Sequence, residues 1–424
     1  MLPLGAAMAL SLTGDLTMYA VLANQTEVLG IGLAVVGILL GVNRLIRIPG
    51  NLLAGALNDR LDPGLGRRRL FLLGLCLGIL STLSYGLVRG FWPLLAGRLL
   101  WGTAWALINV TGYTMVLDWS TSSDRGRMVG FYQMAFMLGL AFSPLLGGTL
   151  TDTVGLRLAL RICAGVSTLG LVIAFLALPE TRPPQEEQRK KSGTGPLLLR
   201  MEARAAIWWQ NLKSCPSHGV RRSIGQVDRQ ILLAGYIYLV TLFVSSGIMM
   251  STIALFLQQR WGSSITFNGL AIGVASLAGM LLAMRAFAGM LAGPLAGTLS
   301  DHLRNRWPVV RLGILLGAAG FVTLALLFQV WAVLLGVALV ALSSGTLATS
   351  LAAIVGDLAK SEQKGRTIGG LATAGDIGSA AGPLVAFALV AVIDLRWIYL
   401  LSALALASAL IATVGQGRRT QRAV

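Results

Sequence analysis

The chain has 424 residues, of which 55% are hydrophobic and only 12% are charged. This balance excludes an ordinary soluble domain, in which roughly a quarter of the residues carry a charge. The formal net charge of +17 would suit a nucleic-acid-binding protein, but the basic residues are distributed in a way that gives the charge another meaning.

Apolar stretches of about 20 residues recur along the chain, and each is long enough to cross a hydrocarbon core of about 30 Å. The sequence therefore predicts an all-α membrane protein with twelve transmembrane helices. The first stretch has no basic leader and no cleavage site, so we expect a span there and not a signal peptide. The predicted spans are residues 2–22, 33–58, 69–88, 92–117, 128–149, 158–178, 231–257, 267–298, 310–329, 331–356, 366–390 and 395–416.

One long polar segment, residues 179–230, interrupts this pattern. It predicts two six-helix bundles, residues 1–178 and 231–424, joined by a cytoplasmic linker, with a short basic tail at the end of the second bundle. Inside the linker, apolar residues recur at helical spacing, at Leu198, Met201, Ala205, Trp208 and Leu212. Such a helix would lie on the inner leaflet or pack on the cytoplasmic ends of the bundles, and both alternatives stay open.

The Lys and Arg residues are distributed unequally between the two sides of the membrane. With residue 1 in the cytoplasm, 25 of the 34 Lys and Arg residues fall in cytoplasmic loops or the tail, five near the outer side and four inside spans. This asymmetry follows the positive-inside rule and places both termini in the cytoplasm. We therefore expect a bacterial cytoplasmic membrane protein that contacts anionic lipids and does not bind nucleic acid.

The sequence offers no chemistry of an enzyme. Cys76, Cys163 and Cys215 have no metal or redox spacing, and the two histidines are far apart. The chain also lacks a phosphate-binding loop and a nucleophile elbow. We expect no metal, no cofactor and no enzymatic activity.

Two sets of residues occur twice in the chain. Gly55-Ala56-Leu57-Asn58-Asp59-Arg60 recurs 242 positions later as Gly297-Thr298-Leu299-Ser300-Asp301-His302. The second set, 239 positions apart, pairs Asp118, Gly126-Arg127 and Ser143-Pro144 with Asp357, Gly365-Arg366 and Gly382-Pro383. Parallel halves of about six membrane helices are typical of transporters that work by alternating access.

Taken together, these motifs resemble the major facilitator superfamily. In that family the loop after the second span reads Gly-x-Leu-x-Asp-Arg, then Gly and basic residues. Here the matching residues are Gly55, Leu57, Asp59, Arg60, Gly66, Arg67 and Arg68, with extra loop residues before Gly66. The resemblance implies a gating role, as opposed to a simple topology signal, for Gly55, Asp59, Arg60, Asp118, Arg127, Gly297, Asp301, Asp357 and Arg366.

The fourth and fifth spans carry two further motifs. Arg98 resembles the fourth-helix arginine of proton-coupled members of the family. The segment from Gly139 to Gly148 resembles the antiporter motif of drug:proton exchangers, except that Ser143 replaces the glycine before the proline. Glycine and proline at these positions permit bending and close helix contact, which we expect at Gly130, Gly139, Pro144, Gly147, Gly148, Gly378, Gly382 and Pro383.

Charged side chains inside the spans are the strongest functional candidates, because they are costly there unless they face a cavity or a partner. At a rise of about 1.5 Å per residue, Arg47 and Asp376 both lie near the midplane. We expect Asp376 to pair with Arg47, and Asp15 to pair with Arg98. The two carboxylates are candidates for proton coupling. A purely structural pairing explains Asp376 equally well, whereas the position of Asp15 before the outer end of a cavity-lining helix favours a protonation switch.

Arg44 and Arg285 lie at similar depth on helices that the repeat relates to each other. With Arg47 and Arg98 they form the set of candidate cavity and substrate residues, and they would give the cavity a positive character.

The sequence thus favours a proton-coupled secondary transporter that exports amphipathic or drug-like small molecules by antiport. A second interpretation is an organic-anion carrier or a lipid or lysolipid flippase, because of the cavity arginines. A third is a transport-inactive scaffold or assembly factor. We expect a monomer whose partners are a small-molecule substrate, protons and membrane lipids.

Overall fold

The structure is a computed structural model that describes residues 1–60, 66–121, 124–181, 229–267, 270–303, 305–358 and 364–414. The predicted linker helix lies outside these residues. In the first half of the chain the helices are α1 (Leu2–Ser11), α2 (Thr13–Val21), α3 (Thr26–Leu29), α4 (Leu33–Leu45), α5 (Arg47–Arg60), α6 (Arg67–Leu87), α7 (Phe91–Trp119), α8 (Arg125–Val154) and α9 (Leu156–Ala177).

The second half begins with one long broken helix and a short hairpin. Its elements are α13 (Arg229–Leu242), the π-helical turn η2 (Phe243–Met249), α14 (Met250–Trp261), β1 (Ser264–Phe267), β2 (Leu270–Gly273), α15 (Val274–His302), α16 (Trp307–Leu326), α17 (Val330–Leu358), α18 (Lys364–Val390) and α19 (Leu395–Ala412). The strands pair antiparallel, with Ser264 opposite Gly273.

Eleven helical stretches of the described chain are long and apolar enough to cross a membrane. The fourth expected span, α7, is not among these eleven. It has 29 residues and completes the expected set of twelve. Its sequence carries Arg98 and four tryptophans, which lower its mean hydropathy although its length suffices to span. The expectation of an all-helical membrane protein is confirmed.

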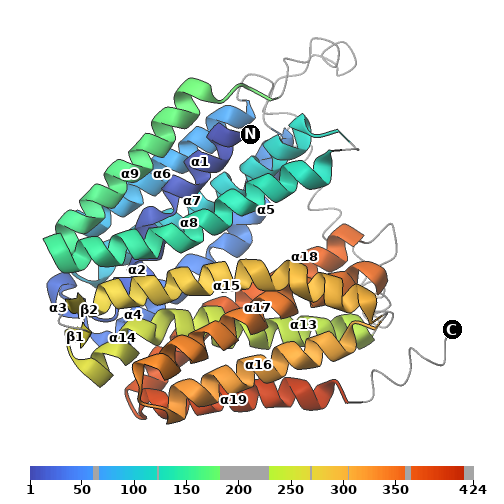
Figure 1. Ribbon diagram of the computed structural model, residues 1–424. Helices are drawn as coiled ribbons and strands as arrows, with labels where there is room; N and C mark the ends of the chain where they lie inside the picture. Colours follow the sequence, from blue (N-terminus) through green and yellow to red (C-terminus); the bar gives the residue numbers. More distant parts are fainter. Residues whose placement is uncertain are drawn as a thin grey trace, which may run out of the picture.

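The helices form two bundles, one from each half of the chain (Figure 1). The bundles converge at the end that carries α3, β1 and β2, which we call the hairpin end. They diverge towards the opposite end, where α5 leads to Gly66 and α7 leads to α8; we call this the terminal end. The interface between the bundles consists mainly of α8 against α15 and of α4 against α18.

Close contacts between the bundles involve glycines packed against backbone. A Cβ added to Gly37 of α4 would lie 2.5 Å from the carbonyl oxygen of Pro383 in α18, and one on Gly279 of α15 would clash with the carbonyl oxygen of Pro144 in α8. Because lipid tails offer helices no hydrophobic drive to associate, such close backbone approach is a principal source of packing energy. These contacts lie between the middle of the helices and the hairpin end.

Two helical stretches of the first bundle are interrupted, one between α4 and α5 and one between α1 and α2. α4 ends at Leu45 and α5 begins at Arg47, because Pro49 has no N–H to donate to the carbonyl four residues earlier. α1 and α2 meet at Leu12, where the hydroxyls of Ser11 and Thr13 bond to backbone carbonyls of the preceding turn, a contact that bends helices.

The structure differs from the sequence prediction at the start of the eighth span. We expected a helix from residue 267, but Phe267 and the segment Leu270–Gly273 belong to the hairpin, and α15 begins at Val274. The hairpin residues are apolar and directly precede the span, so hydropathy does not separate the two. Their β-branched members, such as Ile265 and Ile272, favour strand pairing.

Candidate functional site

The centre of the first bundle holds a buried ion pair. Arg98 of α7 donates to Oδ1 of Asp15 in α2 at 2.5 Å, and the two side chains are 0% and 2% exposed. Arg98 also donates through Nε to the carbonyl oxygen of Leu39 at 3.0 Å. The predicted contact between Asp15 and Arg98 is therefore present, while the role of Asp15 in proton coupling stays a prediction.

Two more side chains complete the surroundings of Asp15. Asn43 of α4 donates from Nδ2 to Oδ1 at 2.9 Å, and Arg47 of α5 lies 3.5 Å from Oδ2. The Arg47 guanidinium also stacks 5.3 Å from the centre of the Trp105 ring. The single negative charge of Asp15 thus faces the positive charges of two arginines, Arg98 and Arg47.

Arg44, at the end of α4, reaches across to the second bundle. Its Nε donates to the hydroxyl of Tyr19 at 3.0 Å, and its Nη2 lies 3.7 Å from the sulfur of Met250 in α14. The guanidinium also lies 5.3 Å from the Tyr19 ring centre. Among the described residues Arg44 has a hydroxyl, a thioether and an aromatic face as partners, and no carboxylate within ion-pair distance.

Arg285 of α15 approaches the same place from the second bundle. It is 9% exposed and donates through Nη2 to the hydroxyl of Ser246 at 2.8 Å, while its Nε is buried without a hydrogen-bond partner. Ser246 belongs to the π-helical turn, one turn before Met250, the residue that Arg44 contacts. Arg44 and Arg285 thus approach the same part of one helix from different bundles, and like charges gathered there repel.

Asp376 of α18 is partly exposed and does not form the predicted pair with Arg47. Within the described residues the ion pair of Arg47 goes to Asp15, and Asp376 interacts with Arg47 and Arg44 only at longer range. The error has a physical reason. Rise per residue gives the depth of a side chain, but not the direction in which it leaves the helix.

We call Arg44, Arg47, Arg98 and Arg285, with Asp15 and Asp376, the arginine cluster. Four cations stand against two carboxylates, so the cluster carries a net charge of about +2 within helices that are long enough to cross a membrane. The sequence analysis missed Tyr19 and Asn43. Asn43 is a polar residue inside a span, one turn before Arg47, and that spacing could have revealed it.

The internal repeat does not supply a second copy of the central ion pair in the second bundle. The position 239 residues after Arg98 is Val337 of α17, and both side chains are fully buried. The second bundle therefore has an apolar residue where the first has the arginine of its central ion pair.

At the terminal end, the gating candidates form contacts inside each bundle. Asp118 accepts from Arg67, and the related Asp357 accepts from Nε of Arg306 at 2.7 Å. Each pair joins the start of one helix to the end of the next in the same bundle: Arg67 begins α6 and Asp118 is in α7, while Arg306 directly precedes α16 and Asp357 is in α17. Arg127 lies over the ring of Phe131, whereas the side chains of Asp59, Arg60, Asp301 and Arg366 lie outside what the structure describes.

The glycine and proline candidates differ in their contacts. Pro144, Pro383 and Gly148 pack across the bundle interface, and the others that pack closely do so within a bundle, namely Gly139, Gly147, Gly378 and Gly382. Among the described residues, a Cβ on Gly130 or Gly55 would meet nothing within 4 Å, and Gly297 has an ordinary contact with Thr349.

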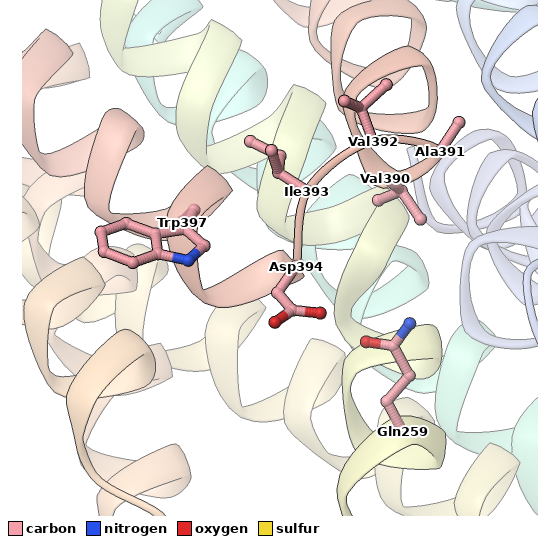
Figure 2. A pocket seen from close by; sticks show the side chains of 7 residues that line it. All are labelled: Gln259, Val390, Ala391, Val392, Ile393, Asp394 and Trp397. Carbon is pink, nitrogen blue, oxygen red and sulfur yellow. The ribbon is translucent and has the colours of Figure 1, made fainter.

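A separate pocket of about 380 Å³ lies at the hairpin end. Figure 2 shows Asp394 pointing towards Gln259, with Trp397 beside it. The other lining residues are Val390, Ala391, Val392 and Ile393. Gln259 is nine residues beyond Met250, so the pocket lies about 13 Å along α14 from the arginine cluster. Within the described residues no group of acidic, histidine and cysteine side chains could hold a metal ion.

Comparison with protein families gives one match that covers most of the chain. The profile of the Major Facilitator Superfamily matches residues 4–286 and 275–422. Curated relatives match shorter stretches. Protein spinster homolog 3 of Danio rerio is 32% identical over 134 residues, which are 31% of this chain and 26% of that protein.

The probable L-galactonate transporter of Escherichia coli is 31% identical over 162 residues, which are 38% of this chain and 35% of that protein. The matches thus span about a quarter to a third of the length of these two relatives.

Solved structures share the fold at low sequence identity. A peptide transporter POT in complex with sulfate has a TM-score of 0.73 and 15% identity, covering 99% of this chain and 94% of that one. A bacterial homolog of the human lysosomal transporter Spinster, in an inward-facing and occupied conformation, has a TM-score of 0.67 and 17% identity. That alignment covers 97% of this chain and 92% of the homolog.

Proposed function

The chain belongs to the major facilitator superfamily and is a secondary transporter, and on that premise we propose that it carries an organic anion through the arginine cluster. The observation that supports the proposal most is the excess of cations. Arg44 and Arg285 have no carboxylate partner within ion-pair distance among the described residues. Unpaired charges in a membrane interior are costly, so their retention is best explained by an anion that joins them during transport.

The neighbours of the cluster indicate what else the substrate carries. Tyr19, Met250 and Trp105 present aromatic and thioether surface directly beside the guanidinium groups. A substrate with an acidic group and a less polar body would use both kinds of surface. The L-galactonate transporter, by its name, carries a sugar acid, which is one compound class to test first.

The direction of opening follows from the predicted topology. If the termini are cytoplasmic, the hairpin end is outside, and the contacts of Gly37 and Gly279 close the outer side. The structure then represents an inward-facing state. Alternating access would break these contacts and bring together the loop residues of the gating motif at the terminal end.

Proton coupling remains part of the proposal, with Asp15 and Asp376 as the carriers. A coupling carboxylate must change its protonation between the two access states, which requires its surroundings to change. We expect Asp15→Asn and Asp376→Asn each to abolish accumulation driven by a pH gradient and to retain downhill exchange. Full pH-driven accumulation by both variants in proteoliposomes would exclude these residues.

A second candidate function is proton-coupled export of amphipathic drug-like compounds. It draws on the glycine–proline motif of α8, in which Gly147 packs on Thr17 and Gly148 packs on the backbone at Ala275. This packing shows how the motif can hold α8 between the bundles. The packing of this motif does not indicate the charge of the substrate, whereas the positive charge of the arginine cluster does.

The deciding experiment compares anions with cations on the purified transporter. Proteoliposomes are loaded with radiolabelled L-galactonate, oleoyl-lysophosphatidate or the cation tetraphenylphosphonium, and uptake and release are followed. We expect an anion to be carried, and Arg44→Gln to reduce its transport by at least tenfold, the loss of one charge-assisted contact. Transport of the cation alone, unaffected by Arg44→Gln, would favour drug export and contradict the anion proposal.

A further inference from the structure

The structure places two cations from different bundles around one turn of one helix. Arg285, in the second bundle, bonds to Ser246, and Arg44, in the first bundle, contacts Met250. Ser246 and Met250 lie four residues apart, so their side chains project from neighbouring positions of η2 and α14. The turn is π-helical, and π-helical turns within α-helices are frequently found at functional sites.

Neither arginine has a carboxylate within ion-pair distance among the described residues, and Asp376 interacts with Arg44 only at longer range. Ser246 and Met250 offer a hydroxyl and a thioether, and the Nε of Arg285 is buried without a partner. Like charges gathered at one part of a helix repel each other. In the state described, the bundles diverge towards the terminal end (Figure 1).

The repulsion becomes important when the carrier changes state. Between the inward-facing and outward-facing states a transporter passes through an arrangement in which both ends are shut. Water then leaves the centre, and two unpaired cations from opposite bundles are pressed together in a low-dielectric environment. An anion bound between them removes the repulsion and contacts both bundles at once.

We propose that Arg44 and Arg285 form a clamp for one anionic group of the substrate, and that this clamp makes exchange much faster than net transport, because the empty carrier closes only slowly over two cations that lack a carboxylate partner. This inference rests on the proposed anion transport and states whether that transport runs mainly as exchange or as net movement. The loaded carrier crosses readily in either direction, whereas the return of the empty carrier is the slow step of net transport.

The experiment measures release from proteoliposomes that contain the full chain, with labelled L-galactonate and labelled inorganic phosphate as probes. Valinomycin and equal potassium on both sides clamp the membrane potential, so charge accumulation does not limit net efflux. We expect release to be roughly tenfold or more faster when the same unlabelled anion is present outside, given the few kcal/mol that an unpaired intramembrane charge costs.

Variants test whether the clamp formed by Arg44 and Arg285 causes the difference between the rate of exchange and the rate of net efflux. Arg285→Gln removes one cation, so the empty carrier should cross more easily and the ratio of exchange to net efflux should fall towards one. Arg285→Lys keeps the charge and should keep the ratio, which also guards against misfolding of the glutamine variant. Arg396→Gln, a change of equal charge at the exposed hairpin end, is the matched control and should behave as the unmodified protein.

Three results would overturn the inference. One is net efflux as fast as exchange in the unmodified protein; the second is an unchanged ratio in well-folded Arg285→Gln. In both cases anion transport itself survives. The third is that neither probe is carried while tetraphenylphosphonium is, in which case the anion proposal fails and the clamp fails with it.

Discussion

Gly279 of α15 lies so close to the carbonyl oxygen of Pro144 in α8 that a methyl group on the glycine could not be accommodated. The internal repeat carries both residues. Gly37 is the counterpart of Gly279 at an offset of 242, and Pro383 is the counterpart of Pro144 at an offset of 239. Gly37 packs on Pro383 in the same way, so two related contacts close the hairpin end.

We predict that Gly279→Ala and Gly37→Ala shift the carrier away from the described state. A Cβ at either position would come within 3.0 Å of a backbone oxygen, and backbone cannot move aside as a flexible side chain can. Spin labels on Thr153 and Thr266, two exposed residues at the hairpin end, should report a longer distance in both variants. Gly165→Ala in α9, where a Cβ would meet nothing within 4 Å among the described residues, should leave the distance unchanged.

Asp152 provides a polar contact at the same end. Its Oδ2 accepts from the backbone N–H of Ser276 at 2.6 Å, in the first turn of α15, where N–H groups lack intrahelical partners. We predict that Asp152→Ala opens the hairpin end and that Asp152→Asn does so less, because the amide oxygen still accepts. The same spin-label pair measures both. Equal distances in Asp152→Ala and the unmodified protein would show that this hydrogen bond does not hold the bundles together.

The buried pair of Asp15 and Arg98 should contribute to stability only as a pair. Removing one partner of a buried ion pair typically costs about 3–5 kcal/mol, because the other charge is left uncompensated. We expect Arg98→Gln to cost about 3 kcal/mol, at the lower end because Asn43 and Arg47 still contact Asp15. In thermal unfolding in detergent, Asp15→Asn combined with Arg98→Gln should be more stable than Arg98→Gln alone. Additive losses would contradict the pairing.

Membrane orientation can be tested with single cysteines. In a background without Cys76, Cys163 and Cys215, a cysteine at Thr266 should react with an impermeant maleimide applied to intact cells, because the hairpin is expected outside. Cysteines at Thr121 and Ser192 should react only after the membrane is opened, because 25 of 34 basic residues cluster on that side. Labelling of Ser192→Cys from outside would reverse the topology.

The sequence was sufficient for the fold because helix length and hydropathy are local properties that the bilayer enforces. It also brought Asp15 and Arg98 together, since both are buried charges at similar depth on helices of one bundle. It failed for Arg47, whose partner is Asp15 and not Asp376. The break between α4 and α5, which Pro49 causes, changes the direction of the Arg47 side chain, and depth alone carries no such information.

Three other features of the structure could not be predicted, because their sequences look like those of the neighbouring membrane helices. The strands of the hairpin are as apolar as the span that follows, so they were read as helix. The π-helical turn at Phe243–Met249 depends on packing, because Gly247 lies against Gly382 of α18. The contacts of the glycines with the backbone depend on which faces of two distant helices meet, which a single sequence does not specify.

The replacement of Arg98 by Val337 at the related position of the second bundle has a consequence for what each half of the chain tolerates. Arg98 is one partner of a buried ion pair, and removing one partner of such a pair is strongly destabilising because the other charge is left uncompensated. Val337 is equally buried but uncharged, so another apolar side chain of similar volume can take its place at a small cost. The two halves share a fold, yet substitution at the same place in it should be far more damaging in the first half than in the second.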